Sequence, residues 1–251
     1  MTKREAYAIQ LQSCSDWGAF LRTHSGLPGP RGNLELAQAA ADAGTARQFR
    51  EWLRQDPIRA PTNTPGEFVA VCGVIGHGRL LAEGRASACA VLRAAASDPR
   101  WRVREAVAMG LQRLGASDMG ELLRVVEPWA RGAPLEQRAA AAALCEPALL
   151  RDPRHAGRVL RLLDRITRSL ARSQDRRADD FRILRQGLGY CWSVAVAAAP
   201  EAGKPLLEKW LESRDPDVQW VVRENLGKAR LQRTDRRWVA GMRARRTRPA
   251  S

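Results

Sequence analysis

The chain has 251 residues, of which 45% are hydrophobic, and its formal net charge at pH 7 is +15. This length is enough to bury a full core, as one domain or as one continuous array of repeats. The charge favours phosphate-rich or acidic partners, while an excess of arginine from a GC-rich genome is the alternative explanation.

Several classes of protein do not fit the sequence. Met1–Glu5 leads into no apolar segment, so no secretory signal is expected. The longest apolar run, residues 194–199, is too short to cross a bilayer, so no membrane partner is expected. Five scattered cysteines without a Cys-x-x-Cys pair are typical of a reduced, cytoplasmic protein. We expect neither a metal nor another cofactor, because the three histidines lie far apart and have no cysteine at ligand spacing: His24, His77 and His155.

The chain is predicted to be helical throughout, because Ala, Leu, Arg, Glu and Gln dominate and β-branched runs are short. Residues 1–32 are expected to form an N-terminal helix and a linker that contains the turn-forming residues 26–30. Asp-Pro pairs at Asp98, Asp152 and Asp215 predict helix starts, since Asp caps a helix and Pro suits its first position.

Residues 73–78 read Gly-Val-Ile-Gly-His-Gly, which raises the alternative of a phosphate-binding loop. No strand is predicted before them, and their spacing differs from that of dinucleotide-binding and P-loop motifs. A glycine-lined contact between helices is therefore the expectation for this segment.

Two segments that begin with Asp-Pro resemble each other. Residues 98–106 and residues 215–225 both contain Trp-x-Val-Arg-Glu, and about three units of about 40 residues separate them. A weaker copy occupies residues 135–140. This period predicts paired helices that stack into a right-handed α-α superhelix, a HEAT-like α-solenoid, over residues 33–240. The core of such a solenoid is expected to contain most of the tryptophans Trp101, Trp129, Trp192, Trp210 and Trp220.

A row of arginines is the most informative feature of the chain. The arginines follow one another at steps of three and four residues, which places them on one face of a helix from about Pro153 to Ser173. The opposite face carries Val159, Leu163 and Ile166. The row consists of Arg151, Arg154, Arg158, Arg161, Arg165, Arg168 and Arg172.

This row predicts contact with nucleic-acid phosphates, because each guanidinium fork can donate two hydrogen bonds to one phosphate group. The helix would be roughly 30 Å long, close to one turn of B-form DNA. Phosphate contacts position a duplex without reading its sequence. An acidic protein partner and an inert solvated face are the alternatives. Residues 241–251 are expected to be a disordered basic tail that assists the contact.

Four further positions carry a resemblance to a known family. Trp101 is followed four residues later by Glu105, Arg138 lies in Gln-Arg-Ala-Ala, and Tyr190 ends Gly-Leu-Gly-Tyr. In this order they resemble the site of the DNA alkylation repair family of HEAT-like DNA glycosylases, which remove cationic alkylated bases from DNA held in a basic groove. The resemblance implies that these four residues form the site. The family has Asp and Trp at the positions of Glu105 and Tyr190, and residues 145–178 are an insertion relative to its pattern.

The resemblance to HEAT repeats also implies ladders of Asp and Arg between neighbouring units, here Asp98 with Arg104 and Asp215 with Arg223. The Trp and Glu of residues 101–105 recur at residues 220–224, so a generic repeat is an alternative explanation for them.

The sequence therefore predicts a monomeric, non-catalytic protein that binds nucleic acid, first of all duplex DNA, through phosphates. The first alternative is an alkylpurine DNA glycosylase of the HEAT-like type, which would hydrolyse an N-glycosidic bond. The second alternative is a scaffold for protein–protein interactions, a common role of α-solenoids.

Overall fold

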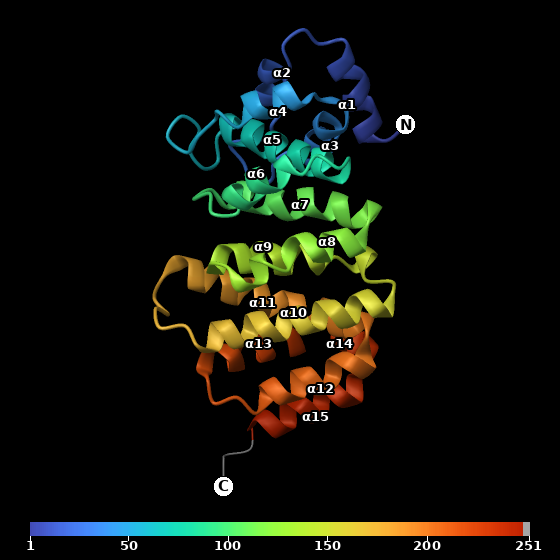
Figure 1. Cartoon of the computed structure of the whole chain (residues 1–251), viewed down its shortest axis with the longest axis vertical. Helices are drawn as coiled ribbons and strands as arrows, with labels where there is room; N and C mark the ends of the chain where they lie inside the picture. The colour runs from blue at the N-terminus through green and yellow to red at the C-terminus, as the bar shows by residue number, and fades with distance from the viewer. Residues whose placement is uncertain (248–251) are drawn as a thin grey trace. The chain divides into compact units, whose positions relative to one another are not determined.

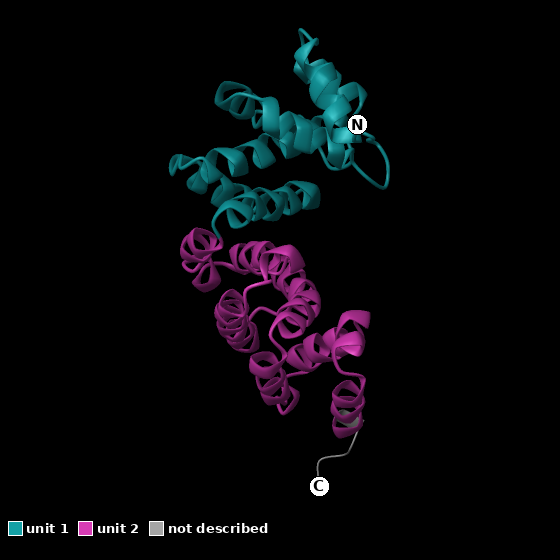
Figure 2. Ribbon diagram, turned by 90° about the vertical axis from the view of Figure 1, so that its right-hand side faces the viewer, with its two compact units in different colours: residues 1–118 teal, residues 119–251 magenta. Residues whose placement is uncertain are grey.

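The computed structural model describes residues 1–247, and their side chains up to residue 245. Over this range the regular structure is helical, with no β-strand, which confirms the predicted all-α class (Figure 1). None of the described helices is long and apolar enough to cross a membrane. The chain divides into two compact units, residues 1–118 and residues 119–251, which Figure 2 colours separately.

The first unit is built around a central helix, α5, against which α2, α3, α4, α6 and α7 pack. Most of α5 is buried, because most of its residues are apolar or small, although the buried residues include Glu67 and His77. Residues 1–32 contain two helices, and both pack on this unit, α1 against α3 and α2 against α5. The helices are α1 (Lys3–Gln12), α2 (Trp17–Thr23), α3 (Leu34–Ala43), α4 (Ala46–Trp52), α5 (Pro65–Ala82), α6 (Ser87–Ala95) and α7 (Trp101–Ser117).

The glycines of α5 allow its close packing, as residues 73–78 predict. A Cβ atom on Gly78 would lie 2.2 Å from the Cα atom of Gly110 in α7. A Cβ atom on Gly76 would lie 2.4 Å from the ring of Phe49 in α4. Only a residue without a side chain fits at these two crossings, so the expected glycine-lined helix contact is confirmed.

The second unit places its helices in two layers. Helices α9, α11 and α13 pack side by side in one layer, and α10 packs against α11, α8 and α12 in the other (Figure 1). The elements are α8 (Met119–Val126), η1 (Trp129–Arg131), α9 (Pro134–Leu144), η2 (Pro147–Leu149), α10 (Pro153–Ala171), α11 (Asp179–Ala198), α12 (Pro200–Leu211), α13 (Pro216–Leu226), α14 (Ala229–Thr234) and α15 (Arg236–Thr247).

The last helix, α15, extends into the segment that the sequence assigned to a disordered tail. The helix continues to Thr247, so the predicted boundary at residue 241 lies inside it. Met242 is buried, and Arg243 donates a hydrogen bond to the Leu226 carbonyl at 2.8 Å. These contacts explain why the helix continues past residue 240. Residues 248–251 of the predicted tail lie outside the described residues.

Of the three Asp-Pro pairs that were predicted to start helices, two do so. Asp152 caps α10, and Asp215 caps α13. Asp98 does not cap α7, because its carboxylate binds the backbone N–H and guanidinium of Arg100, and the helix starts at Trp101.

The predicted ion pairs of the Asp–Arg ladder, Asp98 with Arg104 and Asp215 with Arg223, are wrong. The Asp215 carboxylate pairs with Arg176 at 2.5 Å, whereas Arg223 lies next to Glu224 at 4.0 Å. Arg104 donates to the backbone carbonyl of Asp98 at 2.6 Å, while the carboxylate holds Arg100. The partner of Asp215 comes from the loop between α10 and α11, and a repeat pattern does not contain such a loop.

Asp215 predicts a pH dependence of stability. Burial by itself raises the pKa of Asp215, but hydrogen bonds from the Arg176 guanidinium and from backbone N–H groups outweigh it and hold the pKa below its usual value. A depressed pKa in the folded state contributes stability above the unfolded pKa of about 3.9, and this contribution is lost as the pH falls through the folded pKa. We expect Asp215→Asn, which can still cap α13, to be less stable than wild type at neutral pH, with a difference that shrinks below about pH 4. Urea unfolding at neutral pH and at acid pH measures this, and a constant difference would contradict it.

Candidate nucleic-acid interface

The arginine row lies on α10, and the local sequence explains the limits of this helix. Asp152 accepts a hydrogen bond from the Arg154 N–H at 2.8 Å, and Pro153 occupies the first helical position. The helix ends at Ala171, close to the predicted end. Its inner side is apolar and buried, which turns the arginines outward: Ala156, Val159, Leu160, Leu162, Leu163, Ile166 and Leu170.

We call the outer side of α10, with one flanking residue at each end, the arginine face. It consists of Arg151, Arg154, Arg158, Arg161, Arg165, Arg168 and Arg172. All of these residues are exposed except Arg165, whose side chain is 40% exposed. The structure therefore contains the one-sided array of guanidinium groups that the spacing predicts.

The arginine face carries more positive than negative charge. Three of its arginines have a carboxylate neighbour, at 2.8, 2.7 and 3.4 Å: Arg154 with Asp152, Arg168 with Asp164, and Arg165 with Glu127. Side-chain and backbone hydrogen bonds from Arg154 lower the pKa of Asp152 to about 2. Asp164 is shared with Lys209 of α12 at 2.8 Å. Within the described part of the chain, the remaining arginines of the face form no ion pair: Arg151, Arg158, Arg161 and Arg172.

A shallow hollow of about 250 Å³ lies on the arginine face. Arg158, Arg161 and Arg165 of α10 line it, together with Glu127, which follows α8. Leu123 and Leu162 complete the lining. Three guanidinium groups thus converge on one small concave surface that contains a single carboxylate.

Tyr190, one of the site residues implied by the resemblance, lies on a different side of the second unit. Trp192 of α11 is fully buried and points toward α10, where its indole N–H donates to the Thr167 hydroxyl at 3.0 Å. Tyr190 precedes it by two residues, about 200° around the helix, so its ring points away from α10. The arginine face and the Tyr190 ring therefore point to different sides of the second unit.

Trp101 is not a core residue, although the sequence predicted that most of the tryptophans are. Its side chain is 47% exposed at the first position of α7, and the Arg102 guanidinium lies 4.3 Å from its ring centre. Trp220 is half-buried, with the Arg185 guanidinium 4.5 Å from its ring. The core prediction is confirmed for the other three: Trp129, Trp192 and Trp210.

The exposure of Trp101 predicts a small effect on stability. We expect Trp101→Ala to change the free energy of unfolding by less than about 1 kcal/mol, since the ring fills no buried space and its contact with Arg102 lies at the surface. Urea unfolding measures this. A loss of several kcal/mol would show that the ring is buried in solution.

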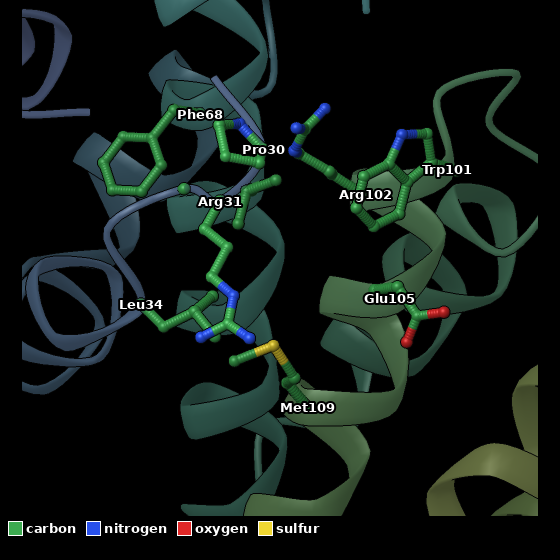
Figure 3. A pocket seen from close by; sticks show the side chains of 10 residues that line it. Pro30, Arg31, Leu34, Phe68, Trp101, Arg102, Glu105 and Met109 are labelled. Atoms are coloured by element: carbon green, nitrogen blue, oxygen red, sulfur yellow. The ribbon is translucent and has the colours of Figure 1, made fainter. Parts of the chain in front are cut away.

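Trp101 and Glu105 line an apolar pocket of about 360 Å³ in the first unit. Figure 3 shows the loop residues Pro30 and Arg31 facing the side chains of α7 across this pocket. The remaining lining is mostly apolar, from Gly32, Leu34, Phe68, Val71, Arg102 and Met109. The sequence contains no signal for this wall, because residues 26–30 have only the composition of a turn between helices.

The other two residues of the resemblance, Arg138 and Tyr190, lie in the second unit. A Cβ atom on Gly187 of α11 would lie 3.3 Å from the Cγ atom of Arg138, so the stem of this arginine crosses α11 one turn before Tyr190. Tyr190 is 46% exposed, and Arg230 donates to its hydroxyl at 2.9 Å. Two of the four residues therefore lie in each unit.

Among the described residues, no group of three or more His, Cys, Asp or Glu side chains is arranged to hold a metal ion.

Comparisons of the chain with models of protein families, with curated proteins and with solved structures gave no significant match.

Proposed function

We propose that this chain is a nucleic-acid-binding protein that contacts phosphates through its arginine face. The observation that carries the proposal is the row of exposed guanidinium groups on α10, four of which lack an ion pair among the described residues. Charge of one sign on one side of a helix attracts phosphates and accelerates their encounter with the protein.

Duplex DNA is the first partner that we propose. The 19 residues of α10 rise by about 1.5 Å each, so the helix covers slightly less than one turn of B-form DNA, about 34 Å. Arginine suits this contact because its planar fork can bind two phosphate oxygens. Contacts of this kind hold the duplex in place without selecting a base sequence.

We propose that the fold is a right-handed HEAT-like α-solenoid. The layer of α9, α11 and α13, with α10 packed against α11 in a second layer, supports this assignment for the second unit. Similarly, α3, α5 and α7 pack in succession in the first unit. Paired helices of this kind bury their apolar sides against their neighbours.

Binding to labelled duplex DNA, single-stranded DNA and structured RNA tests the proposed function. We expect micromolar or tighter binding to duplex DNA at low salt, since phosphate contacts dominate non-specific affinity. Absence of binding to all three would contradict the proposal. An acidic protein that is recovered after nuclease treatment and binds the arginine face directly would instead favour an interaction scaffold.

A second candidate function, an alkylpurine DNA glycosylase, is favoured by the exposure of Trp101 beside Glu105. Trp101 is 47% exposed, and Trp101 and Glu105 line the same pocket. An aromatic face attracts a cationic base, and a carboxylate stabilises the positive charge that grows on the sugar as the base leaves.

Release of methylated purines from alkylated duplex DNA tests this second candidate. We expect Glu105→Gln to abolish release, while Glu224→Gln, at the equivalent repeat position, leaves it unchanged. No release by the wild-type chain, or equal release by both variants, would refute the glycosylase function.

A further inference from the structure

The hollow on the arginine face contains a carboxylate at the point where a phosphate interface would gain most from positive charge. Glu127 lies between α8 and η1 and lines the hollow with Arg158, Arg161 and Arg165. Its presence lowers the local charge from three positive groups to a net of two. An interface that only attracted phosphates would gain nothing from this residue.

Glu127 is held loosely by its neighbours. It accepts hydrogen bonds from Arg131 and Arg165, both at 3.4 Å and both through the same oxygen, Oε1. These distances exceed the usual range of about 2.7–3.2 Å. The Glu127 side chain is also 45% exposed. Its displacement from the hollow would therefore break only long, solvent-screened contacts.

The arginines of the hollow can form stronger hydrogen bonds with a phosphate group than they form with the Glu127 carboxylate. Arg158 and Arg161 are exposed and form no ion pair within the described residues. A phosphate group offers several acceptor oxygens, and charge-assisted bonds from guanidinium to phosphate are shorter and stronger than ordinary hydrogen bonds. Leu123 and Leu162 provide apolar lining, which reduces the screening of these contacts by water.

We infer that the hollow is a phosphate-binding subsite and that the Glu127 carboxylate competes with phosphate for its guanidinium groups. A phosphate of the nucleic-acid backbone displaces this carboxylate when it binds. This inference rests on the proposed function, because it names the place on the arginine face where a phosphate binds. Glu127 sets the affinity of the face by occupying the subsite until a phosphate arrives. A free phosphate ion has the same chemistry and is the alternative ligand of this subsite.

The test compares Glu127→Gln with Glu212→Gln, an exposed carboxylate that pairs with Arg245 on another part of the second unit. Both variants raise the net charge by one. We expect Glu127→Gln to bind duplex DNA about three- to fivefold more tightly than Glu212→Gln, as for removal of one surface charge next to a bound phosphate. Its plot of log K against log salt should also be steeper by up to about 0.9, the value of one added phosphate contact. Equal affinities and slopes for the two variants would overturn the inference.

A second probe separates failure of the subsite from failure of the proposed function. Inorganic pyrophosphate is expected to raise the Tm of Glu127→Gln more than that of Glu212→Gln, and to leave the Tm of Arg158→Ala/Arg161→Ala unchanged. If DNA does not bind but this pattern holds, the subsite stands as a site for free phosphates and the proposed function fails. If DNA binds through the arginine face while the two glutamine variants behave alike with both probes, the function stands and the subsite fails.

Discussion

Reversal of four charges on the arginine face is expected to weaken duplex DNA binding by about a thousandfold. The variant carries Arg→Glu at four positions, Arg158, Arg161, Arg165 and Arg168. Each lost contact and each new repulsion contributes about 0.5 kcal/mol at an exposed site. Eight such contributions sum to about 4 kcal/mol, which is about three orders of magnitude in Kd. Fluorescence anisotropy with a labelled duplex measures the change.

The matched control reverses four exposed arginines elsewhere, Arg54, Arg59, Arg182 and Arg233. This control has the same net charge as the first variant, so it shows how much of the effect comes from total charge alone. Thermal unfolding of both variants checks that they are folded. Equal losses of affinity in the two would show that the arginine face has no special role.

Removal of the Trp192 side chain is expected to lower the free energy of unfolding by about 3–5 kcal/mol. The ring is fully buried between α11 and α10, and Trp192→Ala would leave a large cavity there. The change also removes the donor that satisfies the hydroxyl of Thr167, which is itself fully buried. Urea unfolding monitored by circular dichroism measures the loss.

Trp192→Phe is the matched variant for this prediction. It keeps most of the apolar ring and removes the N–H group, so its loss should be smaller than that of Trp192→Ala. A comparison of Trp192→Ala with Trp101→Ala separates the effect of burial from the effect of residue type, because the same substitution is made at a buried and at an exposed position. A loss below about 1 kcal/mol for Trp192→Ala would contradict the packing of α10 on α11.

Much of the fold could be predicted because local patterns determine it. The helix from Pro153 and its arginine-rich side follow from steps of three and four residues, and the buried side of α10 is apolar as the spacing requires. The crossing at Gly78 and Gly110 could be expected from the glycines of residues 73–78, because helices approach closely only where side chains are absent.

The sequence could not predict features that depend on contacts between distant segments. Trp101 is exposed at the first position of α7, and Asp98 binds Arg100 instead of capping this helix. The partner of Asp215 is Arg176, which comes from a loop that interrupts the repeat pattern. The periodicity of a sequence predicts which side of a helix is apolar, but it does not predict which loop residue will contact that helix.

The candidate interface could be predicted from the sequence only in part. The seven arginines and their common side were evident from spacing, but the hollow was not, because Glu127 and Leu123 come from the segment before η1. In the first unit, Glu105 was singled out by resemblance, whereas the facing wall at Pro30 and Arg31 belongs to a loop without a periodic signal.

The salt dependence of duplex DNA affinity tests the central claim most directly. If about six arginines of the face contact phosphates, a plot of log K against log salt should have a slope near −5, at about 0.9 per contact. The four-arginine reversal on α10 should reduce this slope to about −2, because about two contacts would remain, while the control reversal should retain most of the wild-type slope. A shallow slope for the wild-type chain, or absence of binding at low salt, would contradict the assignment of the arginine face as a phosphate-binding surface.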